Sequence, residues 1–344
     1  MSENERVVRV PLPAAQIRRM DDLILQGAGG FLTRTEFIRE AIESQIVELA
    51  YPMAGELTSA DAPLAGRGMS ATKGVRESGP QEELGNVPGG AVLAAIGRGV
   101  SVEPTDLQVV DEALFGLHNR DFPSLWALSL LAQRANDGPI SWTEFARCAT
   151  DKAWELGRAL QANYPAKMSA LFPTNPAKYQ QASSAFREFA LGRVETSGSR
   201  RVGRGPLFAW QIATVAGDEA APLVGVTSQG WTLLEALEDL SIDQPHSRHH
   251  AEVFLGHLER WAPCDFEALR TVAAAAAEQL SRGQLVEAVT RLMPGWKPSV
   301  VATNATGYVA RAREWGLLEG RLVDGCYAAT AFGTEFLVKG ERNA

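Results

Sequence analysis

The sequence predicts a mainly helical protein with small β elements, arranged as parts of different character. Residues 106–338 are dense in Trp, Phe and Leu at helical spacing, which is typical of packed amphipathic helices. Residues 52–104 contain ten Gly and five Pro, a level at which aperiodic sequence rarely folds. We therefore predict a small N-terminal unit over residues 1–51, a flexible linker over 52–104, and two helical domains over 105–240 and 241–344.

Composition limits the classes of protein to consider. The chain of 344 residues is 45% apolar, which suffices for ordinary hydrophobic cores. No apolar run approaches 18 residues without a charge, and the start MSENERVV has no basic leader, so we expect a cytoplasmic protein without a membrane segment. Three scattered cysteines predict free thiols. A net charge of −8 argues against a surface that is basic throughout, so any nucleic-acid contact must use a local basic face.

The N-terminal unit has the pattern of a strand followed by two short helices. Residues 7–12 alternate, so that Val8, Val10 and Leu12 share one face of a strand. The apolar spacing after residue 13 suits a helix that ends at the glycines of GAGG. A second helix begins at Thr33, where Glu36 completes a capping box. Such a unit is too small to bury much core alone.

The stretches VRVPLP and GGFLTRTEFIREAI resemble the strand, turn and second helix of the ribbon-helix-helix family of DNA-binding proteins. The resemblance implies a homodimer that pairs its N-terminal strands and helices. It also implies that the outer strand face reads bases in the major groove and that the second helix binds a phosphate at its start. An alternative is that this unit only dimerises. The residues implied as DNA contacts are Arg6, Val7, Arg9, Pro11, Thr33, Arg34 and Thr35.

Three pairs of short stretches recur in the same order along the rest of the chain. DFPSL at residue 121 resembles DFEAL at residue 265, REF at residue 187 resembles REW at residue 313, and TSQG at residue 227 resembles TAFG at residue 330. The offsets between partners are 144, 126 and 103 residues. A steady decrease is expected if the first copy carries longer insertions, so the pattern predicts a structural duplication.

Each copy resembles the winged-helix fold, in which three helices precede a small hairpin. The phrase REWGLLEG, followed by a turn at Asp324-Gly325 and by GCYAATAFGTEFL, carries the resemblance in the second copy. It implies that the third helix enters the major groove and the hairpin touches the adjacent backbone. The implied contacts in the second copy are Lys297, Ser299, Asn304, Thr306, Tyr308 and Arg311. Those in the first copy are Lys178, Gln181 and Arg187 on the helix, and Arg200, Arg201 and Arg204 in the hairpin stretch SGSRRVGRGP.

Motifs of enzyme chemistry are absent from the sequence. It contains no GxGxxG after a strand, no phosphate-binding Walker loop, no HExxH and no GxSxG. His246, His249, His250, His257 and Cys264 form a dense group, but no carboxylate or cysteine pattern completes a recognisable metal site. We read them as surface or interface histidines, and expect no catalytic residues, no cofactor and no metal.

These features together predict a bacterial or phage-type DNA-binding transcription regulator. The expected protein is a nucleoid-associated homodimer that acts as a repressor through several weak DNA contacts on one chain. Winged helices also serve as protein-interaction modules, so one copy need not bind DNA. Two alternatives therefore remain: a plasmid partition or centromere-type DNA-organising protein, and an adaptor or antitoxin-like protein whose C-terminal part holds a protein partner.

Overall fold

The computed structural model describes residues 13, 16–18, 20–21, 34, 38, 93, 97–103, 107–109, 113, 120–163, 171–175, 179–197, 200–217, 221–242, 246–293, 295–296 and 298–342. The chain forms two compact units, Met1–Ala50 and Tyr51–Ala344. The predicted strand at residues 7–12 and most of the predicted linker lie outside the described residues. Helices dominate the described chain and its strands are short, which confirms the prediction of a mainly helical protein with small β elements. None of the described helices is long and apolar enough to cross a membrane.

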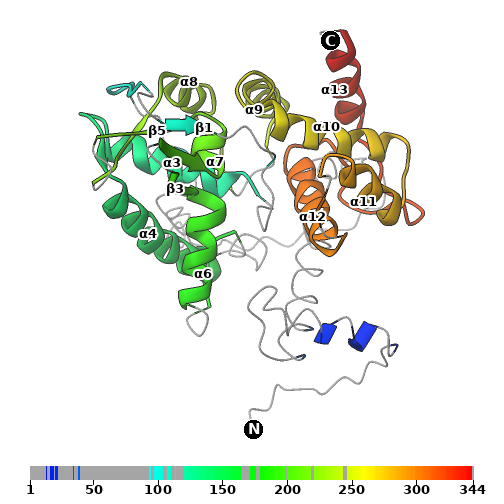
Figure 1. The fold of residues 1–344 in the computed structure, drawn as a ribbon. Helices are drawn as coiled ribbons and strands as arrows, with labels where there is room; N and C mark the ends of the chain where they lie inside the picture. Colours follow the sequence, from blue (N-terminus) through cyan, green and yellow to red (C-terminus); the bar gives the residue numbers. More distant parts are fainter. Residues whose placement is uncertain are drawn as a thin grey trace, which may run out of the picture. The chain divides into compact units, whose positions relative to one another are not determined.

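The first half of the larger unit, residues 120–242, combines helices with two hairpins (Figure 1). Pro123 in the first turn of α3 and Ser141 ahead of α4 favour helix starts at these places. In chain order its elements are α3 (Phe122–Arg134), β2 (Ile140–Ser141), α4 (Trp142–Asn163), α6 (Tyr179–Phe186), η4 (Arg187–Leu191), β3 (Arg193–Ser197), β4 (Arg200–Arg204), α7 (Pro206–Ala209), β5 (Ala213–Ala216), β6 (Leu223–Val226) and α8 (Ser228–Ala236).

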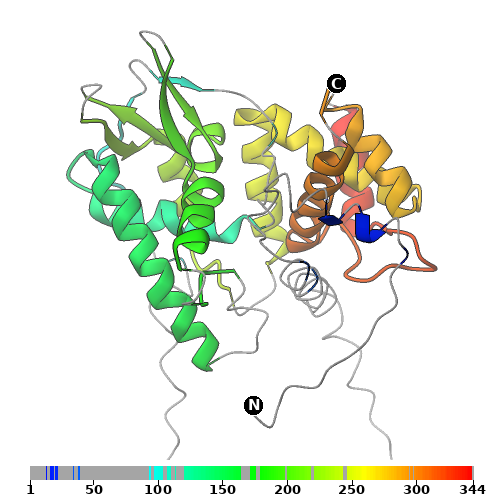
Figure 2. The ribbon, with the colours of Figure 1, turned by 60° about the horizontal axis from the view of Figure 1, so that its bottom comes forward.

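The second half, residues 246–342, is built mainly from helices. Ser247 and Ser281 cap the starts of two of them, and Ser281 forms a capping box with Gln284. The helices are α9 (Arg248–Trp261), α10 (Pro263–Ala277), α11 (Arg282–Thr290), α12 (Pro298–Glu314) and α13 (Ala331–Arg342). In Figure 2 the first half (cyan to green) and the second half (yellow to red) lie beside each other, with α9 between them.

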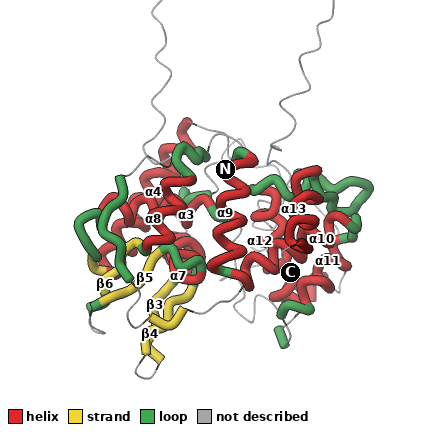
Figure 3. The backbone as a smooth tube through the Cα atoms, turned by 90° about the horizontal axis from the view of Figure 1, so that it is seen from above, coloured by secondary structure: helices red, strands yellow, loops and turns green. Residues whose placement is uncertain are grey.

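Two small sheets organise the described strands. In the first, β4 pairs with β3 in an antiparallel hairpin and with β1 (Leu107–Val109) in parallel. In the second, β6 lies between β2 and β5, with Ile140 opposite Val224. Isolated bridges make a similar pattern in the second half, where Ser281 just before α11 pairs with Cys326 of the following hairpin. Figure 3 shows the β3–β4 hairpin projecting beyond the helices of the first half.

The β3–β4 hairpin interrupts the third helix of the first half. Helical structure runs through α6 and η4 to residue 191 and resumes at the start of α7. The backbones of Gly192 and Gly205 meet where the chain leaves and returns, and both residues have positive φ, 95° and 88°. A Cβ on Gly192 would lie 2.1 Å from the carbonyl oxygen of Arg204, so glycine is required there. Because α12 runs without a break in the second half, the hairpin is an insertion specific to the first half.

The two halves share one hydrophobic cluster. Phe254 of α9 packs between them, with its ring edge-on to Trp210 at 5.1 Å and stacked on Trp315 at 4.5 Å. Leu93 is also buried in this cluster, and its backbone bonds to Leu240 and Asp239. The regions predicted as domains 105–240 and 241–344 therefore have a continuous core.

The third helix ends in the same way in both halves. The amides of Trp210 and Trp315 each donate to the carbonyl oxygen four residues earlier, at 3.0 and 3.1 Å. The following residue has positive φ in each case, 56° at Gln211 and 69° at Gly316. Such a left-handed residue is the usual way to end an α-helix, and it turns the chain into the hairpin.

A threonine caps the last helix of each half. The hydroxyl of Thr227 accepts the amide of Gly230 at 3.0 Å, and that of Thr330 accepts the amide of Gly333 at 2.9 Å. Each hydroxyl also donates to the carbonyl of the left-handed residue in the preceding turn, at 2.6 Å in both halves. The two Thr-x-x-Gly stretches singled out in the sequence thus occupy equivalent places.

The second of the three predicted matches, REF at residue 187 with REW at residue 313, does not join structurally equivalent residues. The counterpart of Trp315 is Trp210, which shares its turn and its backbone hydrogen bond, and not Phe189. The reason is the inserted hairpin, which separates the main part of the third helix from its last turn. The matching offsets are therefore 144 residues for the aspartates, 105 for the tryptophans and 103 for the threonines.

Candidate nucleic-acid interface

The N-terminal candidates are only partly within the described chain. Arg6, Val7, Arg9, Pro11, Thr33 and Thr35 lie outside it. Arg34 is described and exposed, and its guanidinium donates two hydrogen bonds to the carboxylate of Asp21, at 2.5 and 2.6 Å. This hydrogen bond raises the pKa of Arg34 and lowers the pKa of Asp21. A phosphate that approached Arg34 would therefore compete with an internal carboxylate.

The α6 helix presents polar side chains on its outer face. Gln181 of α6 and Arg187, the first residue of η4, are exposed, whereas Ser183 and Phe186 are buried. Two contacts to α4 fix this orientation: Tyr179 stacks on Trp154 at 4.9 Å, and the Trp154 indole donates to the Ser183 hydroxyl at 2.9 Å. Arg187 also reaches α4, where its Nε donates to the Thr150 hydroxyl. The remaining helix candidate, Lys178, is outside the described residues.

The arginines of the β3–β4 hairpin differ from the expected basic tip. Arg201 is buried, and its Nη1 donates to the carbonyl of Ala216 at 3.1 Å, so it stabilises the fold and is not available to DNA. Arg204 forms an ion pair with Glu195, which also pairs with Arg193 at 2.6 Å. For Arg200 only the backbone in β4 is described. The adjacent strand supplies a carboxylate that the stretch SGSRRVGRGP lacks, and the hairpin is therefore less basic than its tip sequence predicts.

Three of the predicted contacts on α12 are wrong, because they face inward. Asn304, Tyr308 and Arg311 are buried with Val301 and Ala305 on the helix face that packs into the core. Polar residue types had suggested an exposed face, but their spacing places them one turn apart on the buried one.

One other candidate on α12, Thr306, lies at a partly exposed position. Thr306 is half-buried and accepts a hydrogen bond from Arg282 of α11. Ser299 belongs to the first turn of the helix, where only its backbone is described, and Lys297 precedes the described helix. The outward positions described on α12 include Val300, Thr303 and Thr306, and not the large polar side chains that the sequence predicts.

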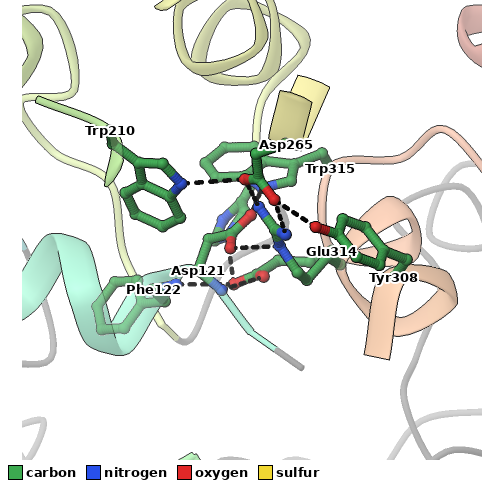
Figure 4. A network of polar contacts seen from close by, with 9 residues as sticks. Asp121, Phe122, Trp210, Asp265, Tyr308, Glu314 and Trp315 are labelled. Atoms are coloured by element: carbon green, nitrogen blue, oxygen red, sulfur yellow. Dashed lines mark hydrogen bonds and ion pairs between the residues drawn. The ribbon is translucent and has the colours of Figure 1, made fainter. Parts of the chain in front are cut away.

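Arg311 joins the two halves at a fully buried ion pair network (Figure 4). Its Nε donates to Asp121 at 2.7 Å, and Nη1 and Nη2 donate to the two oxygens of Asp265 at 2.9 and 2.6 Å. Burial by itself lowers the pKa of a guanidinium, but the two carboxylates outweigh it and hold the pKa of Arg311 well above its usual value. The cation is therefore permanent, as a buried carboxylate pair requires.

Neutral donors complete the coordination of these carboxylates. The indole of Trp210 donates to Asp265 at 3.0 Å, the indole of Trp315 donates to Asp121 at 2.7 Å, and the hydroxyl of Tyr308 donates to Asp265 at 2.5 Å. Burial raises the pKa of Tyr308 well above its usual value, so the hydroxyl stays a donor. The sequence marked both aspartates as part of a repeat but gave no sign of this network, because its members lie up to 194 residues apart.

Glu314 connects the same region to the start of α3. Its carboxylate accepts the backbone amides of Asp121 and Phe122, at 2.7 and 3.1 Å, and thereby caps the helix from the other half. His246 lies 3.4 Å from Glu314 and its ring is 4.6 Å from that of Trp315. The histidine predicted at a surface or interface is thus mostly buried where the two halves meet.

His257 holds the turn at Trp210 and carries a pH prediction. Its Nε2 lies 2.8 Å from the carbonyl of Trp210, which makes Nε2–H the donor, and burial lowers the pKa of the imidazole below its ordinary value of 6.5. The unfolded chain then takes up the proton first as pH falls, so stability present above pH 6.5 is lost below it. Urea unfolding at pH 7.5 and 5.5 should show a smaller difference for His257→Gln than for the wild type. Equal differences would contradict this role.

Among the described residues, no group of three or more His, Cys, Asp or Glu side chains has the arrangement of a metal site. Cys148, Cys264 and Cys326 form no disulfide bonds. No protein-family model, curated protein or solved structure matches the chain.

Proposed function

We propose that this protein is a DNA-binding transcription regulator that acts as a homodimer in the cytoplasm. In this proposal residues 1–51 are a ribbon-helix-helix unit that dimerises and contacts DNA. Residues 105–240 and 241–344 are two winged-helix copies that add further contacts, and repression is the regulatory outcome. The sequence resemblance at the N-terminus supports the first part, and the arrangement of helices and hairpins supports the second.

The order of elements in each half supports the winged-helix part of the proposal. Three helices (α3, α4 and α6 in the first half; α10, α11 and α12 in the second) precede a hairpin, and a short segment before the second helix pairs with the returning strand. A threonine-capped helix then follows in both. This arrangement matches a fold that places its third helix in the major groove.

The observation that carries the proposal is the exposed polar face of α6. Gln181 of α6 and Arg187 at the start of η4 are exposed, and a stacking contact and a hydrogen bond from Trp154 of α4 hold α6 in place. Glutamine amides and guanidinium groups are the donors that read adenine and guanine in the major groove. Burial of the α12 candidates leaves this helix as the best-equipped reader among the described elements.

Replacing Gln181 by alanine should weaken binding to a duplex selected by the wild-type protein from a random library. We expect a loss of about tenfold, corresponding to one lost base contact of roughly 1–3 kcal/mol. Fluorescence anisotropy at fixed salt measures it, and the wild-type affinity should fall steeply as salt increases.

The matched control is Gln161→Ala, the same change at an exposed position of α4. It should bind as the wild type does. If the two variants bound equally well, α6 would not be the reading helix. If selection yielded no DNA at low salt, the function itself would be rejected in favour of the adaptor-type alternative.

A further inference from the structure

The hydrogen bonds that join the two halves are reciprocal. Asp121 of the first half accepts the indole of Trp315 in the second, and Asp265 of the second accepts the indole of Trp210 in the first. The two tryptophans end their third helices in the same turn, and each aspartate precedes a phenylalanine in the first helix of its half. The same donor and acceptor positions are thus used in both directions (Figure 4).

Reciprocity of this kind specifies the symmetry of the contact. If the aspartate of each unit contacts the tryptophan of the other, a rotation of 180° exchanges the two contacts, and the units are related by a two-fold axis. Units that followed each other head to tail would bring together only one of the two Asp–Trp pairs, because the other members would lie at opposite ends. The two halves therefore meet as the subunits of a two-fold symmetric dimer do, although they belong to one chain.

Arg311 fits a position on this axis. It bonds to both aspartates at once, which only a group that lies between the two equivalent carboxylates can do. The position four residues before Trp210, equivalent to Arg311, is occupied by Pro206. Two arginines related by the axis would place like charges against each other, so one arginine and one proline are consistent with a fused pair and not with two identical chains.

We propose that a single chain contacts DNA over an inverted pair of half-sites, with the third helices of the two halves facing each other across this pseudo-two-fold axis. The two half-sites differ in sequence, because α6 and α12 carry different outward side chains. The inference rests on the proposed DNA-binding function and adds the symmetry of the site. A protein with two-fold related reading helices requires half-sites related by the same symmetry. In Figure 1, α6 and α12 both lie on the lower side of the larger unit, which lets them address one duplex.

The symmetry predicts the order of contacts along DNA. In a mirrored arrangement the third helices are neighbours and the hairpins that follow them lie outside, in the order hairpin, helix, helix, hairpin. In a tandem arrangement the order within one chain is hairpin, helix, hairpin, helix. If two chains dimerise through another part of the molecule, the order of contacts within each chain stays the same and appears twice on the DNA. Dimerisation therefore does not change a mirrored order into a tandem one.

Four single-cysteine variants that carry an iron chelate for DNA cleavage distinguish these orders. The exposed positions on the third helices are Gln181→Cys on α6 and Thr303→Cys on α12. Those in the hairpins are Ala221→Cys, between β5 and β6 of the first half, and Leu322→Cys in the hairpin that follows α12. They are made in the full-length protein with Cys148, Cys264 and Cys326 replaced by serine, and circular dichroism checks that each is folded. The duplex is the one selected by the wild-type protein from a random library.

Cleavage from Gln181→Cys and Thr303→Cys at adjacent positions, flanked by cleavage from the two hairpin variants, would support the inverted repeat. The tandem order would overturn it while the DNA-binding function stands. Cleavage from the first-half variants alone would also overturn it, and would assign the second half to a protein partner. Exposed Leu292, Trp296 and Val300 on that half are suited to such contact. Selection that recovers no duplex would instead reject the proposed function, and the inference with it.

Discussion

Replacing Arg311 by methionine is expected to destabilise the larger unit by about 3–5 kcal/mol, the usual cost of removing one partner from a buried ion pair. The side chains of Asp121 and Asp265 are fully buried, and Arg311 is the cation bonded to both of them. Without it the two carboxylates keep neutral indole and hydroxyl donors but lose the positive charge that compensates them. Urea unfolding followed by tryptophan fluorescence measures the loss, since Trp210 and Trp315 lie in the network.

Two further variants distinguish the effect of unpaired buried charges from the effect of losing an arginine side chain. Arg248→Met removes an exposed arginine that pairs with Glu252 and Glu335, and it should lower the stability far less than Arg311→Met does, because exposed ion pairs are screened by solvent. Adding Asp121→Asn and Asp265→Asn to Arg311→Met removes the unpaired charges and should recover part of the lost stability. The interpretation fails if the triple variant is less stable than Arg311→Met alone.

The ends of the internal repeat could be predicted from the sequence, but its middle could not. The Thr-x-x-Gly stretches have a local role, because a helix cap needs a threonine and a following amide at fixed spacing. The Asp-Phe stretches also recur, but the role of their aspartates lies in bonds to distant residues. The match of residues 187–189 to 313–315 is wrong, because the β3–β4 hairpin interrupts the third helix of the first half after residue 191. The chain leaves and returns at Gly192 and Gly205, whose backbones are in close contact. The sequence around Gly192 and Gly205 does not distinguish them from other glycines. Their role at the base of the hairpin is evident only from the close contact of their backbones in the structure.

The candidate site could be predicted on α6 but not on α12. Gln181 is exposed on α6, and Arg187 is exposed at the start of η4, where it also donates a hydrogen bond to Thr150 of α4. Asn304, Tyr308 and Arg311 have residue types that suggest DNA contacts, yet they form or adjoin a buried junction. Nothing near Arg311 in the sequence identifies Asp121, 190 residues away, as the group that compensates its charge. Polar residues in a helix are ambiguous in this way whenever the compensating partner is distant.

Gly333→Ala is expected to destabilise the second half by about 3 kcal/mol or more, which is at the upper end of overpacking effects. A Cβ at this position would lie 2.0 Å from the carbonyl oxygen of Leu317, and 2.9 Å from its carbonyl carbon. These are backbone atoms of the turn that follows Trp315, so no side-chain rotation relieves the clash. Moving the helix outward would also break the hydrogen bond from the Gly333 amide to Thr330. Thermal unfolding monitored by circular dichroism measures the effect.

The same substitution elsewhere tests whether the repeated cap is the cause. Gly256→Ala lies within α9, where a Cβ would meet nothing within 4 Å, and it should stabilise the protein by about 0.5–1 kcal/mol through helix propensity. Gly230→Ala places its Cβ 2.1 Å from the carbonyl oxygen of Ile212, so it should destabilise the protein as Gly333→Ala does. If Gly333→Ala were severe but Gly230→Ala mild, the two caps would not be equivalent. The duplication on which the inverted-repeat proposal depends would then lose one of its supports, because equivalent turns are what place Trp210 and Trp315 at matching positions.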